Sequence, residues 1–194
     1  MSSEQNHPAR RNAAERILHG AAERLIEVGA AETSLQDVAI TAGVSKALIH
    51  YHFESKEALL VRVTEWVTNE VVTREREALE NAGAATAVDA LWNWLEQALT
   101  NGHLRLLIEL GVYREPLVQA AIREAIQARH AAAKQTVDRL FALLELRPRV
   151  PTELLATVVV SFVDGLANRP PSDSPADARI AFDIFWLSLL SLAE

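Results

Sequence analysis

The chain has 194 residues, of which 49% are hydrophobic and 23% are charged, a composition typical of a folded globular protein of one domain, or of a small domain joined to a larger one. It contains no cysteine, which excludes disulfide bonds, thiolate metal sites and cysteine nucleophiles and fits a reducing cytoplasm. The net charge of −7 argues against nonspecific coating of nucleic acid. It still allows a local basic surface, because charges act only over about 8–10 Å at physiological salt.

The start of the chain does not have the pattern of a secretory signal. The N-terminal stretch MSSEQNHPARRNAAERI has no apolar core of the kind that a secretory signal needs. No apolar run approaches the roughly 18 residues that span a bilayer. We therefore expect a cytoplasmic protein that does not enter a membrane.

Alanine, leucine, glutamate, arginine and glutamine dominate the sequence, and alternating strand patterns are scarce. This composition and its apolar periodicity predict an all-α protein of about nine helices. Gly29 is expected to end the first helix in a left-handed conformation. Besides two short helices within 33–53, the expected helices span residues 8–28, 55–80, 87–99, 103–110, 116–146, 152–168 and 176–192.

The segment TSLQDVAITAGVSKALIHYHF, residues 33–53, has the spacing of a helix-turn-helix. Thr33 is the expected N-cap of the first short helix, with Gln36 completing a capping box. Gly43 can take the left-handed conformation of a tight turn, and Ser45 is the N-cap of the second helix. The second helix of such a motif lies in the major groove of DNA.

One alternative for the two histidines of HYHF, His50 and His52, is a metal site. They are residues i and i+2, so on a regular helix their side chains point about 200° apart, which does not favour binding of one metal ion. A second alternative places them on a solvated face with no special role. We favour a DNA-binding role, with Phe53 in the core and Lys56 at the start of the next helix, where ammonium and backbone N–H groups would hold a phosphate. The side chains expected to reach phosphates or bases are Lys46, His50, Tyr51 and His52.

Residues 10–60 resemble the DNA-binding domain of the tetracycline-repressor (TetR) family of transcriptional regulators. The resemblance rests on Ala21-Ala22-x-x-Leu25, Gly29, Thr33-Ser34-Leu35-x-x-Val38-Ala39, Ala42-Gly43-Val44-Ser45 and Tyr51-His52-Phe53-x-Ser55-Lys56-Glu57-x-Leu59. It implies a DNA-binding domain at 1–54, a ligand-binding and dimerisation domain at 55–194, a homodimer, a palindromic operator and a small-molecule effector. The positions that it implies contact DNA are Thr33, Ser34, Ser45, Lys46, Ala47, His50, Tyr51, His52 and Lys56.

Three positions depart from the family pattern. Ala47 replaces a frequent glycine, Leu48 a frequent threonine or asparagine, and His50 a frequent tyrosine. The operator sequence therefore does not follow from the resemblance. A histidine beside a phosphate gains charge near pH 6–7, so we expect DNA binding to tighten as the pH falls.

The last two expected helices are apolar over more than the stripe of about 100° that packing on one core requires. One interpretation is a deeply buried core hairpin. We favour a homodimer interface, formed by Leu155, Val159, Phe162, Phe182, Phe185, Trp186 and Leu189.

An effector pocket is expected among large side chains of the C-terminal domain, although ordinary core packing is the alternative for each of them. These candidates are Trp66, Trp94, His103, Tyr113, Phe141 and Phe162. Asp164 or Glu109 would suit a cationic ligand and Arg105 or Arg114 a carboxylate, whereas salt bridges are the alternative for all four. We expect an apolar or aromatic effector and no cofactor or metal.

The resemblance implies a repressor that leaves DNA when the effector binds, because the ligand favours one tilt of the helix over 55–80. An all-helical enzyme is a competing hypothesis. No Ser/His/Asp set, glycine-rich phosphate loop or paired-histidine motif supports it. A helical adaptor that binds other proteins through its C-terminal hairpin is a further alternative, and it would not bind DNA.

Overall fold

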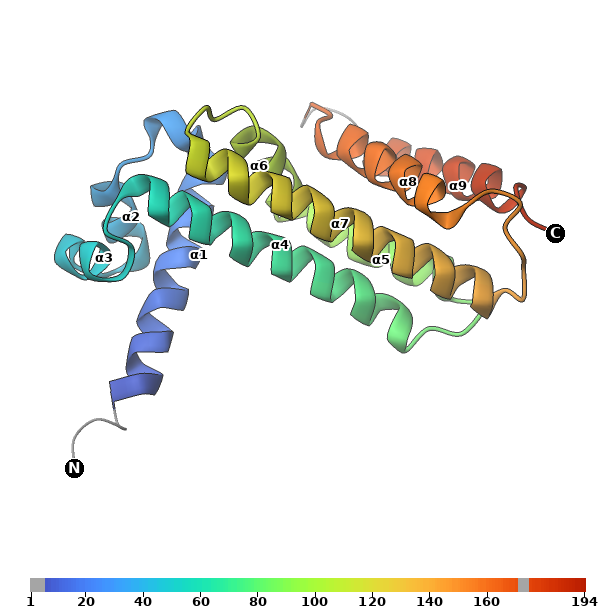
Figure 1. Ribbon diagram of the computed structural model, residues 1–194, viewed down its shortest axis with the longest axis horizontal. Helices are drawn as coiled ribbons and strands as arrows, with labels where there is room; N and C mark the ends of the chain where they lie inside the picture. Colours follow the sequence, from blue (N-terminus) through green and yellow to red (C-terminus); the bar gives the residue numbers. More distant parts are fainter. Residues whose placement is uncertain (1–5, 171–174) are drawn as a thin grey trace. The chain divides into compact units, whose positions relative to one another are not determined.

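The computed structural model describes the backbone of residues 6–170 and 175–194, and this part of the chain folds as nine α-helices (Figure 1). The helix bounds lie within a few residues of those predicted. The helices are α1 (Asn6–Glu32), α2 (Leu35–Ala42), α3 (Lys46–Phe53), α4 (Lys56–Glu80), α5 (Ala87–Thr100), α6 (His103–Leu110), α7 (Pro116–Leu143), α8 (Thr152–Ala167) and α9 (Pro175–Leu190).

Two helix ends differ from the prediction for local reasons. Gly29 leaves helical geometry and has the positive φ that was expected, 81°, but its ψ of 168° lies outside the left-handed helical range, and helical structure resumes up to Glu32. Helix α7 stops three residues before the predicted Leu146. There Glu145 has φ 56°, and the N–H of Leu146 donates to the carbonyl of Phe141, so the helix closes on a left-handed residue.

The chain divides into two compact units. The first contains the residues up to Val67 together with Leu106–Arg123, and the second contains Thr68–Arg105 and Glu124–Glu194. These two units are defined by how the helices pack. The boundary expected between residues 54 and 55 instead separates a DNA-binding domain from a ligand-binding and dimerisation domain. That functional boundary therefore stays a prediction.

The first unit holds α1, α2 and α3 around a small apolar core. Ile17, Ala21 and Leu25 of α1 are buried, and Ile49 of α3 is fully buried. Helices α1 and α2 approach closely at Gly20, where an added Cβ would lie 2.8–2.9 Å from backbone and side-chain atoms of Ala42. Only a glycine fits this contact, so Gly20 fixes the position of α2 on α1.

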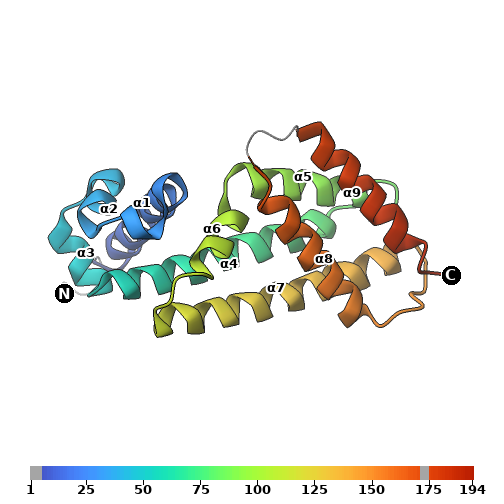
Figure 2. The ribbon, with the colours of Figure 1, turned by 90° about the horizontal axis from the view of Figure 1, so that it is seen from above.

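The second unit is a bundle of the C-terminal part of α4 with α5, most of α7, α8 and α9, in which α8 and α9 lie side by side (Figures 1 and 2). Its core is aliphatic with an aromatic cluster, in which Trp92 meets Phe182 at 5.2 Å between ring centroids. Phe162 of α8 stacks on Phe185 of α9 at 4.1 Å. No helix in the described residues has the length and apolar character of a membrane span.

The burial of α8 and α9 corrects the predicted dimer interface. Five of the seven predicted residues are buried within the chain itself, with at most 6% of their surface exposed: Leu155, Val159, Phe182, Trp186 and Leu189. Their side chains therefore form core rather than an outer face. A different apolar stripe is exposed, and it consists of Leu154, Val158, Ile180, Ile184 and Leu187.

Candidate nucleic-acid interface

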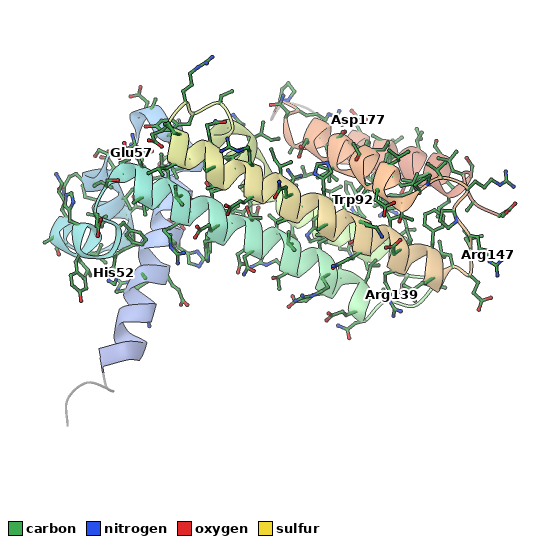
Figure 3. The ribbon with its side chains drawn as sticks, in the orientation of Figure 1. His52, Glu57, Trp92, Arg139, Arg147 and Asp177 are labelled. Carbon is green, nitrogen blue, oxygen red and sulfur yellow. The ribbon has the colours of Figure 1, made fainter. Side chains whose placement is uncertain are left out.

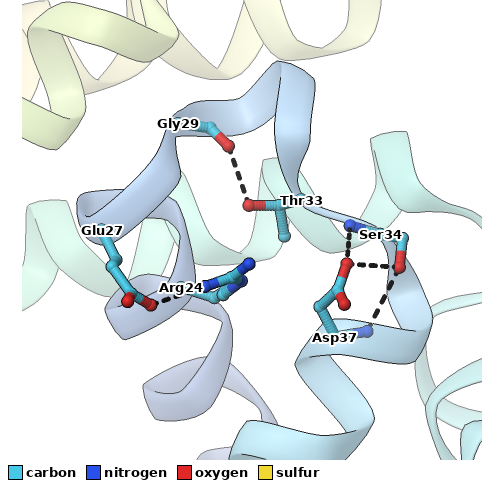
Figure 4. A network of polar contacts seen from close by, with 6 residues as sticks. All are labelled: Arg24, Glu27, Gly29, Thr33, Ser34 and Asp37. Carbon is cyan, nitrogen blue, oxygen red and sulfur yellow. Dashed lines mark hydrogen bonds and ion pairs between the residues drawn. The ribbon is translucent and has the colours of Figure 1, made fainter.

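The first short helix, α2, is capped by Ser34 and not by Thr33. The Asp37 N–H donates to Ser34 Oγ at 3.2 Å, and the Ser34 N–H donates to Asp37 Oδ2 at 2.9 Å (Figure 4). These bonds form the capping box that the sequence placed one residue earlier, at Thr33 and Gln36. The hydrogen bond from the Ser34 hydroxyl holds the pKa of Asp37 below its ordinary value, so a fixed negative charge faces the N-terminus of α2.

Thr33 has a different role. Its side chain is buried, and its hydroxyl donates to the Gly29 carbonyl at 2.8 Å. This bond spans the break in α1 (Figure 4). The prediction that the Thr33 side chain reaches DNA is therefore not supported by its placement, which is that of a structural clamp.

The turn between α2 and α3 has the predicted glycine geometry. Gly43 lies at φ 62° and ψ 41°, and the Val44 N–H donates to the Ala39 carbonyl at 2.9 Å. The guanidinium of Arg16 on α1 donates to the carbonyls of Ala42 and Gly43 at 2.9 and 3.0 Å. Sequence reasoning missed Arg16, because nothing local to the turn signals a partner 26 residues upstream.

The second short helix, α3, begins at the predicted cap, since the Leu48 N–H donates to Ser45 Oγ at 3.2 Å. Ile49 and Phe53 are buried and attach the helix to the core. The opposite side is exposed, with Lys46, Ala47, His50 and Tyr51 on it. In an eight-residue helix, burial of one face and exposure of the other leave these side chains directed away from the core.

The two histidines of α3 occupy different environments. The His50 Nδ1 lies 3.3 Å from the Glu54 carbonyl, and because a carbonyl only accepts, Nδ1 carries the proton of this contact. His52, which is labelled in Figure 3, is half-buried. Its Nε2 is buried with no hydrogen-bond partner in the described residues. No group of three His, Asp or Glu side chains suited to a metal occurs in those residues.

A strained residue joins α3 to α4. Glu54 has φ 57° and ψ −49°, and the Ser55 N–H donates to the Phe53 carbonyl at 2.5 Å, which together form a γ-turn with positive φ. Ser55 then caps α4 by accepting from the Ala58 N–H at 3.1 Å. Lys56, the first residue of α4, is half-buried.

The six predicted effector residues are distributed over both compact units. Trp66 and Tyr113 belong to the first unit, in which the Trp66 ring contacts His19 at 4.5 Å between centroids. In the second unit, Phe141 is buried in the core and His103 is half-buried.

The other two candidates make defined contacts in the second unit. The Trp94 indole N–H donates to the Val71 carbonyl at 3.2 Å, and Phe162 is the ring that stacks on Phe185. Trp94 also lines a small cavity in this unit. The volume of this cavity, about 10 Å³, holds at most one water molecule. A larger cavity of about 240 Å³ lies between α4 and α7 and is lined by none of the six candidates.

The second unit contains a buried polar cluster that sequence reasoning missed. Glu75 is 5% exposed and accepts from the Thr136 hydroxyl at 2.8 Å. Arg129 is 7% exposed and donates to Asp164 at 2.6 Å, which makes Asp164 a salt-bridge partner. Burial raises the pKa of Glu75 to about 7 against the opposing effects of Thr136 and Arg129.

Known proteins resemble this chain in sequence and in structure. Residues 17–63 match the family of bacterial regulatory proteins described as the tetR family. The HTH-type transcriptional activator FasR of Mycolicibacterium smegmatis (strain ATCC 700084 / mc(2)155) is 27% identical over 176 residues, which cover 88% of this chain and 80% of that protein.

Solved structures share the fold along most of the chain. A transcriptional regulator (RHA1_ro04179) from Rhodococcus sp. Rha1 superposes with a TM-score of 0.73 at 21% identity, covering 93% of this chain and 97% of that one. PfmR, a TetR family transcriptional regulator from Thermus thermophilus, gives a TM-score of 0.63 at 24% identity over 90% and 97% of the two chains.

Proposed function

Because this chain belongs to the TetR family of DNA-binding transcriptional regulators and is not an enzyme, we propose that it binds a palindromic operator as a homodimer and is released by a small-molecule effector. The observation that carries the proposal is the exposed side of α3, formed by Lys46, Ala47, His50 and Tyr51. A short helix anchored on one face and open on the other is the element that enters a major groove.

We assign different tasks to the residues around α3. Lys46, His50 and Tyr51 read base edges or the adjacent phosphates, and Ala47 lets the helix approach the groove closely. Ser45 and Lys56 lie at the N-terminal ends of α3 and α4, which suits contacts with phosphates.

His52 and Ser34 complete the assigned surface. His52 orders the end of α3, where its ring lies 5.3 Å from that of Tyr51. Ser34 contributes through the exposed N-terminus of α2, because its hydroxyl is engaged in the cap.

A dimer interface on α8 and α9 is the second part of the proposal. Leu154 and Val158 follow one another at a spacing of four on α8, and Ile180, Ile184 and Leu187 do so at spacings of four and three on α9. These spacings place each set on one helix face, and all five side chains are at least half exposed. Packing this stripe against its copy about a twofold axis would bury it, with the half-buried Phe162 and Phe185 at its centre.

Helix α4 offers the route from effector to DNA. It is one helix from Lys56, next to the recognition helix, to Glu80, and its C-terminal half lines the cavity of about 240 Å³. A ligand that favours one position of α4 would change the affinity for DNA by the ratio of its affinities for the two states.

The sign of regulation needs its own argument. The M. smegmatis relative is named an activator, whereas repression relieved by an effector is our expectation. The same mode of DNA binding is compatible with activation and with repression, because the position of the operator relative to the promoter decides between them. We retain repression as the proposed sign, and a reporter gene placed behind the selected operator tests it.

The test begins with selection of bound fragments from a random DNA pool. We expect a palindrome whose half-site centres lie about 34–36 Å apart or at a multiple of this distance. Lys56→Ala should weaken binding to all sequences and reduce the salt slope by about 1, whereas Lys46→Ala and Tyr51→Ala should change the preferred bases. Lys134→Ala, on α7 of the second unit, is the control. Equal binding by the three α3–α4 variants and the control would reject α3 as the reader.

A further inference from the structure

The cavity of about 240 Å³ between the C-terminal half of α4 and α7 has an apolar interior and a charged rim. Val72 and Leu79 of α4 and Ala132 of α7 line the apolar part, and Leu79 and Ala132 are buried. The volume is slightly below the roughly 300–1,000 Å³ of pockets for drug-sized ligands. The site therefore suits a small compact molecule with one apolar side.

The rim carries more positive than negative charge, in a protein whose net charge is −7. Arg76, Arg139 and Glu80 are its ionisable side chains, and Arg76 Nε lies 3.4 Å from Glu80 Oε1. Arg139 has no ion-pair partner in the part of the chain that the structure describes. It is labelled in Figure 3, where α4 and α7 run side by side. One guanidinium is thus available to a ligand.

The interior side of the cavity has no spare hydrogen-bond donor among its lining residues. Thr136 lines it, but the Thr136 hydroxyl proton is donated to Glu75 at 2.8 Å. A charged group or a hydrogen-bond acceptor of a ligand placed there would lose its hydration and gain no hydrogen bond in return. An acidic group must therefore stay at the rim, near Arg139 and Gln135, while the apolar part points inward.

We infer that this cavity binds a small aromatic or branched monocarboxylate, with its carboxylate on Arg139 and its apolar body on Val72, Leu79 and Ala132. Guanidinium matches a carboxylate in charge and in fork geometry. This inference rests on the proposed function only for the consequence of binding, which is release from DNA. Binding itself is measured without DNA.

Three probes with the same rings test the assignment by calorimetry on the full chain: naphthalene-2-carboxylate, its neutral amide and the cationic 2-naphthylmethylamine. We expect one site per chain, with the carboxylate binding about threefold to tenfold more tightly than the amide and the amine binding most weakly. Raising the salt from 50 to 500 mM should reduce this preference, because the rim is exposed to solvent.

Substitutions separate the rim charge from the interior. Arg139→Gln should remove the preference for the carboxylate, and Glu80→Gln should raise carboxylate affinity about twofold to fivefold. Arg123→Gln is the matched control, since Arg123 is an exposed arginine 16 residues earlier on the same helix and outside the cavity lining. Val72→Phe should abolish binding of all three probes by filling the interior.

The results distinguish the cavity from the regulatory role. Equal affinities for the three probes, or an unchanged preference in Arg139→Gln, would overturn the inference. A carboxylate that binds with the expected charge dependence supports it, whatever happens on DNA. If that carboxylate left operator affinity unchanged, release by this ligand class would be rejected while the binding site would stand.

Discussion

The Thr136 hydroxyl donates to the Glu75 carboxylate at 2.8 Å and links two helices across 61 residues of sequence in the interior of the second unit. Thr136 also lines the cavity of about 240 Å³, and Glu75 lines the small cavity beside Trp94. This hydrogen bond therefore connects a residue that lines the larger cavity with a residue that lines the smaller one. A proton, a ligand or a substitution that alters this bond changes a contact of α4, the helix that begins at Lys56 shortly after the end of α3.

Glu75 should make stability fall as the pH rises. Burial raises its pKa from 4.5 to about 7, so the folded protein holds the proton more tightly than the unfolded chain does. The resulting stabilisation is complete below pH 4.5 and is lost as the pH rises through about 7. The full effect is on the order of 3 kcal/mol, at 1.36 kcal/mol per pKa unit.

Glu75→Gln tests this dependence, because glutamine keeps an acceptor for Thr136 and does not titrate. Measured by urea unfolding, the variant should gain about 2–3 kcal/mol relative to the wild type between pH 5 and pH 8. Glu77→Gln, at an exposed position on the same helix, is the control. Its free energy of unfolding should change with pH in parallel with that of the wild type. Parallel curves for Glu75→Gln would show that its carboxylate is ionised in the folded protein throughout this range.

Gly20→Ala should disturb the packing of α2 against α1. The new Cβ would lie 2.8–2.9 Å from Ala42, and overpacking of this kind costs about 1–3 kcal/mol, which outweighs the gain of about 1 kcal/mol in helix propensity. DNA affinity should fall with stability. Gly83→Ala is the control, because no atom lies within 4 Å of its added Cβ, and it should be neutral or stabilise by up to about 1 kcal/mol. Equal unfolding midpoints for the two variants would contradict the close contact.

Glu54→Gly should relieve the γ-turn between α3 and α4. A residue other than glycine at such angles costs about 1–3 kcal/mol, so a net gain in stability of about 1 kcal/mol is expected after the higher chain entropy of glycine. DNA affinity should nevertheless fall severalfold, because α3 would become freer relative to α4. Glu145→Gly, at the other non-glycine residue with positive φ among those described, should stabilise without changing DNA affinity. Thermal unfolding and gel shift measure the two effects separately.

Leu187→Glu should dissociate the proposed dimer. Leu187 is 71% exposed in the chain, so the charge costs little in the monomer, whereas two copies in an interface would bury carboxylates without partners. We expect the dimer dissociation constant to rise at least tenfold in sedimentation analysis, with loss of operator binding. Leu117→Glu, at a 61% exposed leucine of the first unit, should leave the dimer intact. A wild-type protein that sediments as a monomer would reject the interface.

Local features of the fold follow from the sequence because short-range interactions fix them. The turn at Gly43, the cap at Ser45 and the nine-helix pattern of the described residues each depend on a few neighbouring residues, and the structure has all three. The predicted capping box lies one residue before the observed one, because both Thr33 and Ser34 are good caps. In the structure the Thr33 hydroxyl is bonded to the Gly29 carbonyl, so Ser34 is the residue that caps α2.

Tertiary packing alone decides which face of a helix meets which neighbour. Glu75 continues the buried positions Val67 and Val71 at a spacing of four, but the sequence does not reveal that Thr136 or Arg129 lies beside it. In the same way, α8 and α9 each have two apolar stripes, and packing assigned Leu155 and Trp186 to the core and Leu187 to the surface. The helix-turn-helix is predictable from the sequence because its turn and its helix caps depend on neighbouring residues. The interior sites and the outer apolar face depend on contacts between distant segments, which no local pattern encodes.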